Sequence, residues 1–317
     1  MLMNIRLIPV ALIIVAIASF KPLKLQKSAA IADKFLNDVG IANDPDVLFA
    51  EDFNGGIKNI IARYTEVKNG EGMSTDKNDV PEGSLSSALK ITNRGRVNDG
   101  GHLYKQFKKS FDSVVYVRYY VKYPLSSKGY IHHESVWFGG YNPSTAYPSP
   151  KAGICDLGDK RISVAYEPAN ASAMDTYVYW GDMKPGARGQ CYGNDMVNAA
   201  TEESRLKWDK WMCVETMVKM NNPVSAYNGE LKVWQDGKEV GHWGPNFPKG
   251  YWNIDSWINT PAGAPFKGFR WRTDEALKVN YLWIEFFDDT SPAGTSHHIK
   301  FANLVMAKKY IGPIRKS

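Results

Sequence analysis

Cationic and phenolic side chains alternate with apolar and aromatic ones in the first half of the segment spanning residues 116–142. Arg118, Tyr120 and Lys122 occupy every second position, and Val117 and Tyr119 belong to the intervening set. Successive residues of a β-strand point to opposite faces, so the pattern predicts one buried face and one face of cationic and phenolic groups. Groups of these types on an open sheet surface suit the binding of an acidic polymer.

Two further pairs of residues could do chemistry. His132 and His133 follow the first strand after a turn, and strand alternation is expected to send one imidazole to each face. Tyr177 and Tyr179 are expected to point the same way on a later strand, with Trp180 pointing the other way. A structural role stays the alternative for each of these side chains.

These residue types match the three tasks of β-elimination from a uronic acid polymer. Arg or Lys neutralises the carboxylate, His, Lys or an ionised Tyr removes the C5 proton, and Tyr commonly protonates the leaving oxygen. The assignment of base and acid among the tyrosines and histidines stays open. The catalytic candidates are Arg118, Tyr120, His132, His133, Tyr177 and Tyr179.

Other polar and aromatic side chains are candidates for substrate binding. Glu215 and Lys219 share one face of their strand, and a salt-bridged pair that keeps the sheet soluble is the alternative. Arg270 and Arg272 flank a tryptophan, which suits a sugar acid but also an exposed edge strand. The substrate-binding candidates are Lys122, Lys128, Glu215, Lys219, Arg270, Arg272 and Trp180.

The composition predicts an all-β fold. The 317 residues include 10 Trp, 17 Tyr and 13 Phe, with 27 Gly and 17 Pro. Roughly a dozen strand-like segments without intervening helices predict a single two-sheet antiparallel jelly-roll sandwich over residues 45–314. They include residues 161–167, 230–235, 238–243, 266–272 and 279–287. Residues 19–44 form a separate N-terminal segment, in which the apolar spacing of residues 28–39 predicts a short amphipathic helix that Gly40 ends.

The N-terminus predicts export. One Arg6 precedes an apolar run from Leu7 to Val15, and residues 16–18 resemble a small-residue cleavage site. We interpret residues 1–18 as a signal peptide, with an uncleaved N-terminal anchor as the alternative, and expect a secreted, periplasmic or cell-surface protein. In an oxidising compartment we expect one disulfide, and the loop-like contexts of Cys155 and Cys191 favour that pair over Cys213.

Charge and motifs limit the partners. The net charge of +6 is not concentrated in runs of Lys and Arg, so nucleic acid is not expected as a partner, whereas an acidic polysaccharide fits. No CxxC or HExxH spacing indicates zinc, and no cofactor is expected to be required. Asp and Asn residues in loops could hold a structural Ca²⁺, although no EF-hand-like spacing specifies one. The oligomeric state stays open.

Several segments together resemble the concanavalin A-like jelly-roll proteins, in particular polysaccharide lyase family 14, the alginate and glucuronan-type lyases. The resemblance spans roughly residues 45–314 and lies in GGHLYKQF (100–107), VYVRYYVKYP (115–124), SKGYIHHESVWFGGYN (127–142), WMCVETMVKMN (211–221), GELKVWQDGKEV (229–240) and LVMAKKYIGPI (304–314). It implies β-elimination on a uronate-containing glycan, and it maps the family's paired Tyr-x-Tyr onto Tyr177 and Tyr179. The family's lysine-containing segment after the K-G turn is replaced here by residues 130–133, which leaves Lys128 as the nearest lysine.

Three classes of function fit such a fold, because fold alone does not settle function. The first is an exported polysaccharide lyase, and the second is a non-catalytic carbohydrate-binding protein. The third, a glycoside hydrolase, requires paired carboxylates that flank the scissile bond, and jelly-roll glucanases carry them in an E-x-D-x-(x)-E pattern. That pattern is missing here, since Glu134 has no acidic residue two to five positions later.

Overall fold

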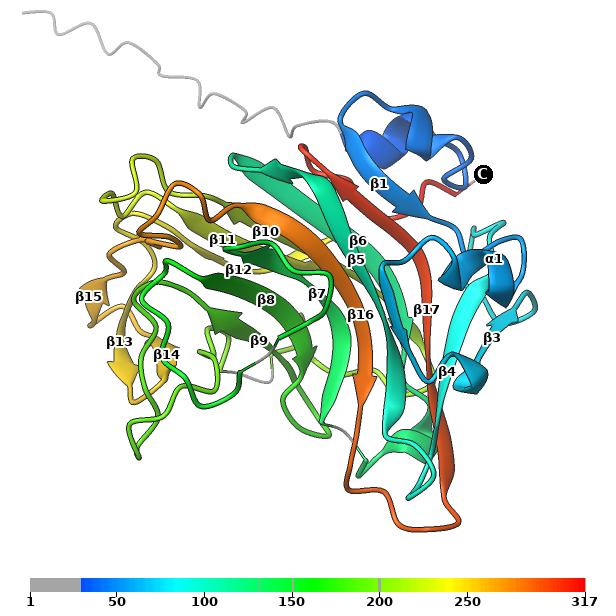
Figure 1. Cartoon of the computed structure of the whole chain (residues 1–317). Coiled ribbons are helices and arrows are strands. Elements are labelled where there is room, and N and C mark those ends of the chain that lie inside the picture. Colours follow the sequence, from blue (N-terminus) through cyan, green and yellow to red (C-terminus); the bar gives the residue numbers. More distant parts are fainter. Residues whose placement is uncertain (1–29, 131, 150, 199–200, 317) are drawn as a thin grey trace, which may run out of the picture.

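The computed structural model describes residues 30–130, 132–149, 151–198 and 201–316. Two large antiparallel sheets pack against each other and curve together (Figure 1), which confirms the predicted jelly-roll sandwich. The segment interpreted as a signal peptide or anchor, residues 1–18, lies outside the described residues. Within the described ranges, no helix has the length and apolar character needed to cross a membrane.

The strands follow a fixed spatial order in each sheet. The eight-stranded sheet runs β12 (Lys238–Trp243), β11 (Glu230–Gln235), β10 (Trp211–Lys219), β6 (Val114–Lys122), β17 (Ser296–Ala307), β4 (Ala88–Arg94) and β3 (Met73–Asp76), with β1 (Val47–Glu51) also pairing with β17. The six-stranded sheet runs β2 (Glu66–Lys68), β5 (Gly100–Phe111), β16 (Val279–Phe287), β7 (His133–Tyr141), β8 (Arg161–Pro168) and β9 (Met174–Tyr179). A small third sheet runs β14 (Ser256–Asn259), β13 (Lys249–Asn253) and β15 (Ala264–Pro265).

Helical structure is sparse in the described part of the chain. It comprises α1 (Ile57–Ile61) and the 3-10 turns Ile31–Lys34, Ile41–Asn43, Gly70–Gly72 and Leu125–Ser127. The N-terminal helix is therefore shorter than the predicted span of residues 28–39. It ends early because Leu36 forms a β-bridge with Arg315, while Ile31 and Ile41 pack against Val305 in a separate small cluster.

The core lies between the two large sheets. Val117, Tyr119, Val121 and Tyr123 of the β6 segment are all buried in it, as their alternation predicts. The opposing sheet contributes residues such as Phe138, which packs in the same cluster. The disulfide between Cys155 and Cys191 forms as predicted, and Cys213 is a buried free thiol.

The other face of β6 is not open, which corrects the prediction made from its alternation. Arg118 donates to Asp38 at 2.7 Å, and the Tyr120 hydroxyl accepts from the backbone N–H of Ile314 at 2.9 Å. Segments from both ends of the described chain therefore cover this face. Alternation distinguishes the two faces of a strand but does not reveal what covers the polar one.

Candidate active site

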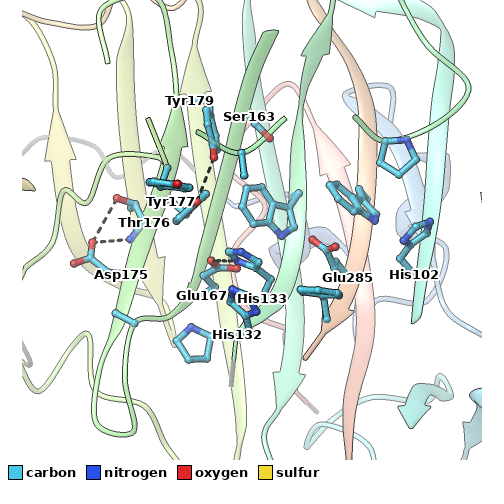
Figure 2. Close-up of a pocket in the computed structure, with 18 of the residues that line it drawn as sticks. His102, His132, His133, Ser163, Glu167, Asp175, Thr176, Tyr177, Tyr179 and Glu285 are labelled. Carbon is cyan, nitrogen blue, oxygen red and sulfur yellow. Dashed lines mark hydrogen bonds and ion pairs between the residues drawn. The ribbon is translucent and has the colours of Figure 1, made fainter. Parts of the chain in front are cut away.

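A groove of about 820 Å³ lies on the face of the six-stranded sheet that points away from the core (Figure 2). Alternation along four neighbouring strands brings one set of side chains to this face. The set comprises His133 and Trp137 from β7, Arg161 and Glu167 from β8, Tyr177 and Tyr179 from β9, and Trp283 and Glu285 from β16.

His133 and Glu167 form a hydrogen-bonded pair in this groove. His133 Nδ1 lies 2.9 Å from Glu167 Oε1, and the side chains are 24% and 7% exposed. Burial acts to lower the pKa of His133, but the charge and hydrogen bond of Glu167, with the charges of Glu285 and Asp289, outweigh it and raise the pKa to about 9. Because Glu167 occupies Nδ1, Nε2 is the ring nitrogen left for a ligand.

Two tyrosines link this pair to a buried arginine. The hydroxyls of Tyr177 and Tyr179 lie 3.2 Å apart, and the Tyr177 ring centroid is 5.2 Å from that of His133. The Arg161 guanidinium carbon lies 4.0 Å from the centroid of the Tyr179 ring.

Burial raises the pKa of Tyr179, while the hydrogen bond with Tyr177 and the charge of Arg161 act in the opposite direction. The pKa of Tyr177 is also raised by burial, and there the neighbouring Tyr179 adds to the increase. Tyr179 is therefore the more readily ionised of the two hydroxyls.

Arg161 has unused hydrogen-bonding capacity. Its side chain is 3% exposed, and Nε donates to Asp156 at 2.7 Å. Nη2 is buried and has no hydrogen-bond partner among the described residues. An unpaired guanidinium nitrogen in a protein interior costs free energy that a bound anion would recover. Because Arg161 lines the groove, a carboxylate bound there is one group that this nitrogen could pair with.

Aromatic rings form the floor of the groove. The ring centroid of Trp137 lies 5.3 Å from that of Tyr177 and 6.1 Å from that of Trp283. Broad apolar rings of this kind are suitable platforms for the faces of sugar rings. In the described part of the chain, no cluster of three or more His, Cys, Asp or Glu side chains is arranged to hold a metal ion.

Four of the predicted catalytic residues line this groove: His132, His133, Tyr177 and Tyr179. The expectation that the two histidines point to opposite faces is wrong. Strand β7 begins at His133, so strand alternation does not apply to His132, whose ring stacks on that of His133 with centroids 4.4 Å apart. The His132 side chain is 46% exposed and lies 3.5 Å from Asp289, at the rim of the groove.

Arg118, Tyr120 and Lys122 lie on the other sheet, away from the groove. Arg118 is fully buried and Tyr120 is 8% exposed beneath the terminal segments. Lys122 binds Asp79 at 2.9 Å. They are brought together on one face as predicted, but that face belongs to the sheet opposite the candidate site.

The remaining substrate-binding candidates also lie outside the groove. Glu215 accepts from the backbone N–H groups of Ile311 and Gly312, and Lys219 pairs across strands with Glu230 at 2.7 Å. Their face of β10 is the outer face of the eight-stranded sheet, and the groove belongs to the other sheet. Arg270 pairs with Asp182, and Arg272 donates to the carbonyl oxygen of Leu277. Lys128 is exposed on a loop, and Trp180 is buried in the core.

Replacing Arg118 by alanine is expected to destabilise the fold without removing the groove. Breaking a buried ion pair leaves Asp38 uncompensated and costs about 3–5 kcal/mol. Urea unfolding would measure this loss. The control is Lys219→Ala, which removes a half-exposed pair and should cost about 1 kcal/mol or less. Equal losses for the two variants would contradict the structural role assigned to Arg118.

The sequence predictions missed two central residues, Arg161 and Glu167. A signal for both was present in RISVAYE, residues 161–167, which are predicted to form a strand. Arg161, Ser163, Ala165 and Glu167 share one face, and Ile162, Val164 and Tyr166 lie on the buried face. This strand therefore carries the same type of pattern, charged residues on one face, that led to the prediction for Arg118.

Comparison with known proteins bears on the fold. No protein-family model matches the chain, and no curated protein matches it. A mutant of the alginate lyase Aly36B, solved in complex with an alginate trisaccharide, matches with a TM-score of 0.51 at 14% identity over 84% of this chain and 99% of that chain. The marine PL-14 alginate lyase from Aplysia kurodai matches with a TM-score of 0.50 at 14% identity over 83% of this chain and 97% of that chain. At such low identity the likeness concerns the fold alone, and the chain has the jelly-roll fold found in these alginate lyases.

Proposed function

We propose that this protein is a polysaccharide lyase that cleaves a uronate-containing glycan by β-elimination in the groove of the six-stranded sheet. The observation that carries the proposal is the buried Arg161, whose Nη2 has no partner among the described residues, beside the His133–Glu167 pair and the two tyrosine hydroxyls. The alginate trisaccharide bound to the structurally similar Aly36B mutant supports an acidic polysaccharide as the substrate class.

Arg161 neutralises the substrate carboxylate in this mechanism. Removing the C5 proton places negative charge on the adjacent carboxylate, and a cation held there lowers the barrier. Asp156 fixes the guanidinium through Nε, so Arg161 is oriented before the substrate arrives. The water-poor surroundings strengthen its effect on the developing charge.

His133 is the base. In its neutral form Nε2 takes the C5 proton, and Glu167 stabilises the imidazolium that results. The electron pair of the broken C5–H bond forms the C4–C5 double bond, and the C4–O bond breaks. Two states of the site carry the same number of protons: neutral His133 with protonated Tyr179, and protonated His133 with ionised Tyr179. The first state is the more populated, because the pKa of His133, about 9, lies below that of Tyr179, which burial raises above its ordinary value.

Tyr179 is the acid that protonates the leaving glycosidic oxygen. Its phenolate is stabilised by the Tyr177 hydroxyl and by the charge of Arg161, so it gives up a proton more readily than Tyr177. The proton gained by His133 and the proton lost by Tyr179 exchange with water after the products leave. Trp137 and Trp283 support the sugar rings from below.

A direct test is the ultraviolet absorbance of the unsaturated uronate that β-elimination leaves on the product. The purified protein would be incubated with alginates, glucuronans and other uronate polymers. A rise with one polymer would support the lyase and name its substrate class. Retention on a polymer affinity gel with no rise for any polymer would overturn the lyase proposal in favour of the non-catalytic binding protein.

The pH dependence of kcat/KM provides a further prediction. Below pH 9 His133 is mostly protonated and cannot accept the C5 proton, so the rate is expected to rise about tenfold per pH unit until the pKa of about 9 is reached. At higher pH the rate falls when Tyr179 loses its proton. Glu167→Gln removes the charge that raises the pKa of His133, so its rising limb should lie at lower pH. An unshifted limb in that variant would contradict the role of Glu167.

We also propose that the protein acts outside the cytoplasm. The disulfide between Cys155 and Cys191 supports this, because such bonds persist mainly in oxidising compartments. Fractionation of cells that express the full chain, followed by immunoblotting, tests the proposal. Recovery only in the cytosolic fraction would overturn it.

A further inference from the structure

Two loops joined by a disulfide form one wall of the groove, and we call them the disulfide wall, residues 151–158 and 187–193. Cys155 and Cys191 are bonded, and Gly153 and Cys191 also pair through both backbone N–H groups at 2.9 and 3.3 Å. The next residue after the second loop, Asn194, is bridged to Val178 of β9. The wall is thus fixed to the edge of the sheet that carries the candidate active site.

The disulfide wall presents apolar surface next to the groove. Tyr192 lines the groove and is 48% exposed, and Ile154 and Leu157 are 50% and 73% exposed. The Tyr192 ring packs over Gly153, where a Cβ would lie 3.8 Å from two of its ring carbons. Backbone pairing and this contact hold the ring in place, which lowers the entropy cost of using it as a binding platform.

The charge of the disulfide wall is positive. Lys151 and Arg188 are exposed, and neither forms an ion pair with any carboxylate of the described residues. Asp156, the acidic residue of these two loops, is committed to Arg161 at 2.7 Å. The wall therefore combines an aromatic ring with two unneutralised cations, and its residues Ala152 and Tyr192 line the groove.

We infer that the disulfide wall is a second binding platform for the substrate polymer. A uronate-containing chain that leaves the catalytic groove stacks a sugar ring on Tyr192 and passes its carboxylates near Lys151 and Arg188. This inference rests on the proposed uronate substrate. Its occupant is a polymer long enough to extend beyond the catalytic residues, so the wall selects long chains over short ones.

Kinetics with long and short substrates test the wall. Tyr192→Ala is expected to raise KM for the polymer about tenfold with kcat nearly unchanged, and to raise KM for a trisaccharide by a clearly smaller factor. Tyr192→Phe is the matched control, because it keeps the ring and should behave as the parent protein does. Replacing both Lys151 and Arg188 by alanine should also raise KM for the polymer and weaken its dependence on salt.

The outcomes separate this inference from the proposed function. An unchanged KM for the polymer in Tyr192→Ala, or an equal change for polymer and trisaccharide, would overturn the inference while the lyase stands. If the parent protein is retained on polymer gels but forms no unsaturated product, the lyase proposal is overturned. Earlier elution of Tyr192→Ala from the same gel would then still support the disulfide wall as a binding platform. A parent protein that is neither retained nor active overturns both. The exposed position of Tyr192 means that its variants should unfold at the parent temperature.

Discussion

Replacing His133 by alanine is expected to lower kcat by about 10³-fold, since a positioned general base contributes roughly 10²–10⁴ to the rate. Glu167 holds the Nδ1 of His133 at 2.9 Å, which leaves Nε2 as the ring nitrogen available to a substrate in the groove. The variant is measured by the appearance of unsaturated product at saturating polymer. Its residual rate should also lose the rising limb near pH 9, because that limb reports the proton on His133.

His132→Ala is the matched control for this variant. The two rings stack on each other with centroids 4.4 Å apart, so a general disturbance of the stack would affect both variants. His132 has a half-exposed side chain at the rim and lacks a buried carboxylate partner such as Glu167. We expect its rate to stay within about threefold of the parent, since surface substitutions change little. Similar losses in the two variants would argue against a specific base at His133.

The sandwich could be predicted because its strands carry regular alternation. The strands at Glu230–Gln235, Lys238–Trp243 and Val279–Phe287 have the predicted bounds. The predicted strand at residues 266–272 is wrong. Gly268 has φ +101°, and this segment makes only a single bridge, between Phe269 and Gly229. Its aromatic rings pack in the core as a strand's would, so the pattern reflects burial rather than pairing.

The location of the site could be predicted only in part. The Tyr177–Tyr179 pair and His133 were identified because local residue types indicated them, and these side chains do lie together. Arg118 was expected in the site because its strand face is polar. Asp38 lies 80 positions earlier in the chain and covers that face, which is a long-range contact that strand periodicity does not encode. Open and covered polar faces have the same pattern in sequence.

Arg161→Ala is expected to lower kcat/KM by about 10³-fold, the loss typical of removing one donor that stabilises charge in a transition state. Arg161→Lys should recover part of the activity, because lysine keeps the charge but loses the planar fork that fits a carboxylate. Both variants disturb the contact with Asp156, so lost stability must be separated from lost catalysis. Comparing the free polymer with its methyl ester achieves this.

The ester carries no carboxylate charge, so a cation at Nη2 has only the developing enolate charge to stabilise, whereas the free acid already carries a full charge before the proton is removed. If Arg161 acts as proposed, Arg161→Ala should lose much less activity on the ester than on the free acid. A loss of the same size on both substrates would assign Arg161 to structure alone, and the unpaired buried nitrogen would then need another ligand. The charge of the substrate, and not the integrity of the groove, is the variable that this comparison changes.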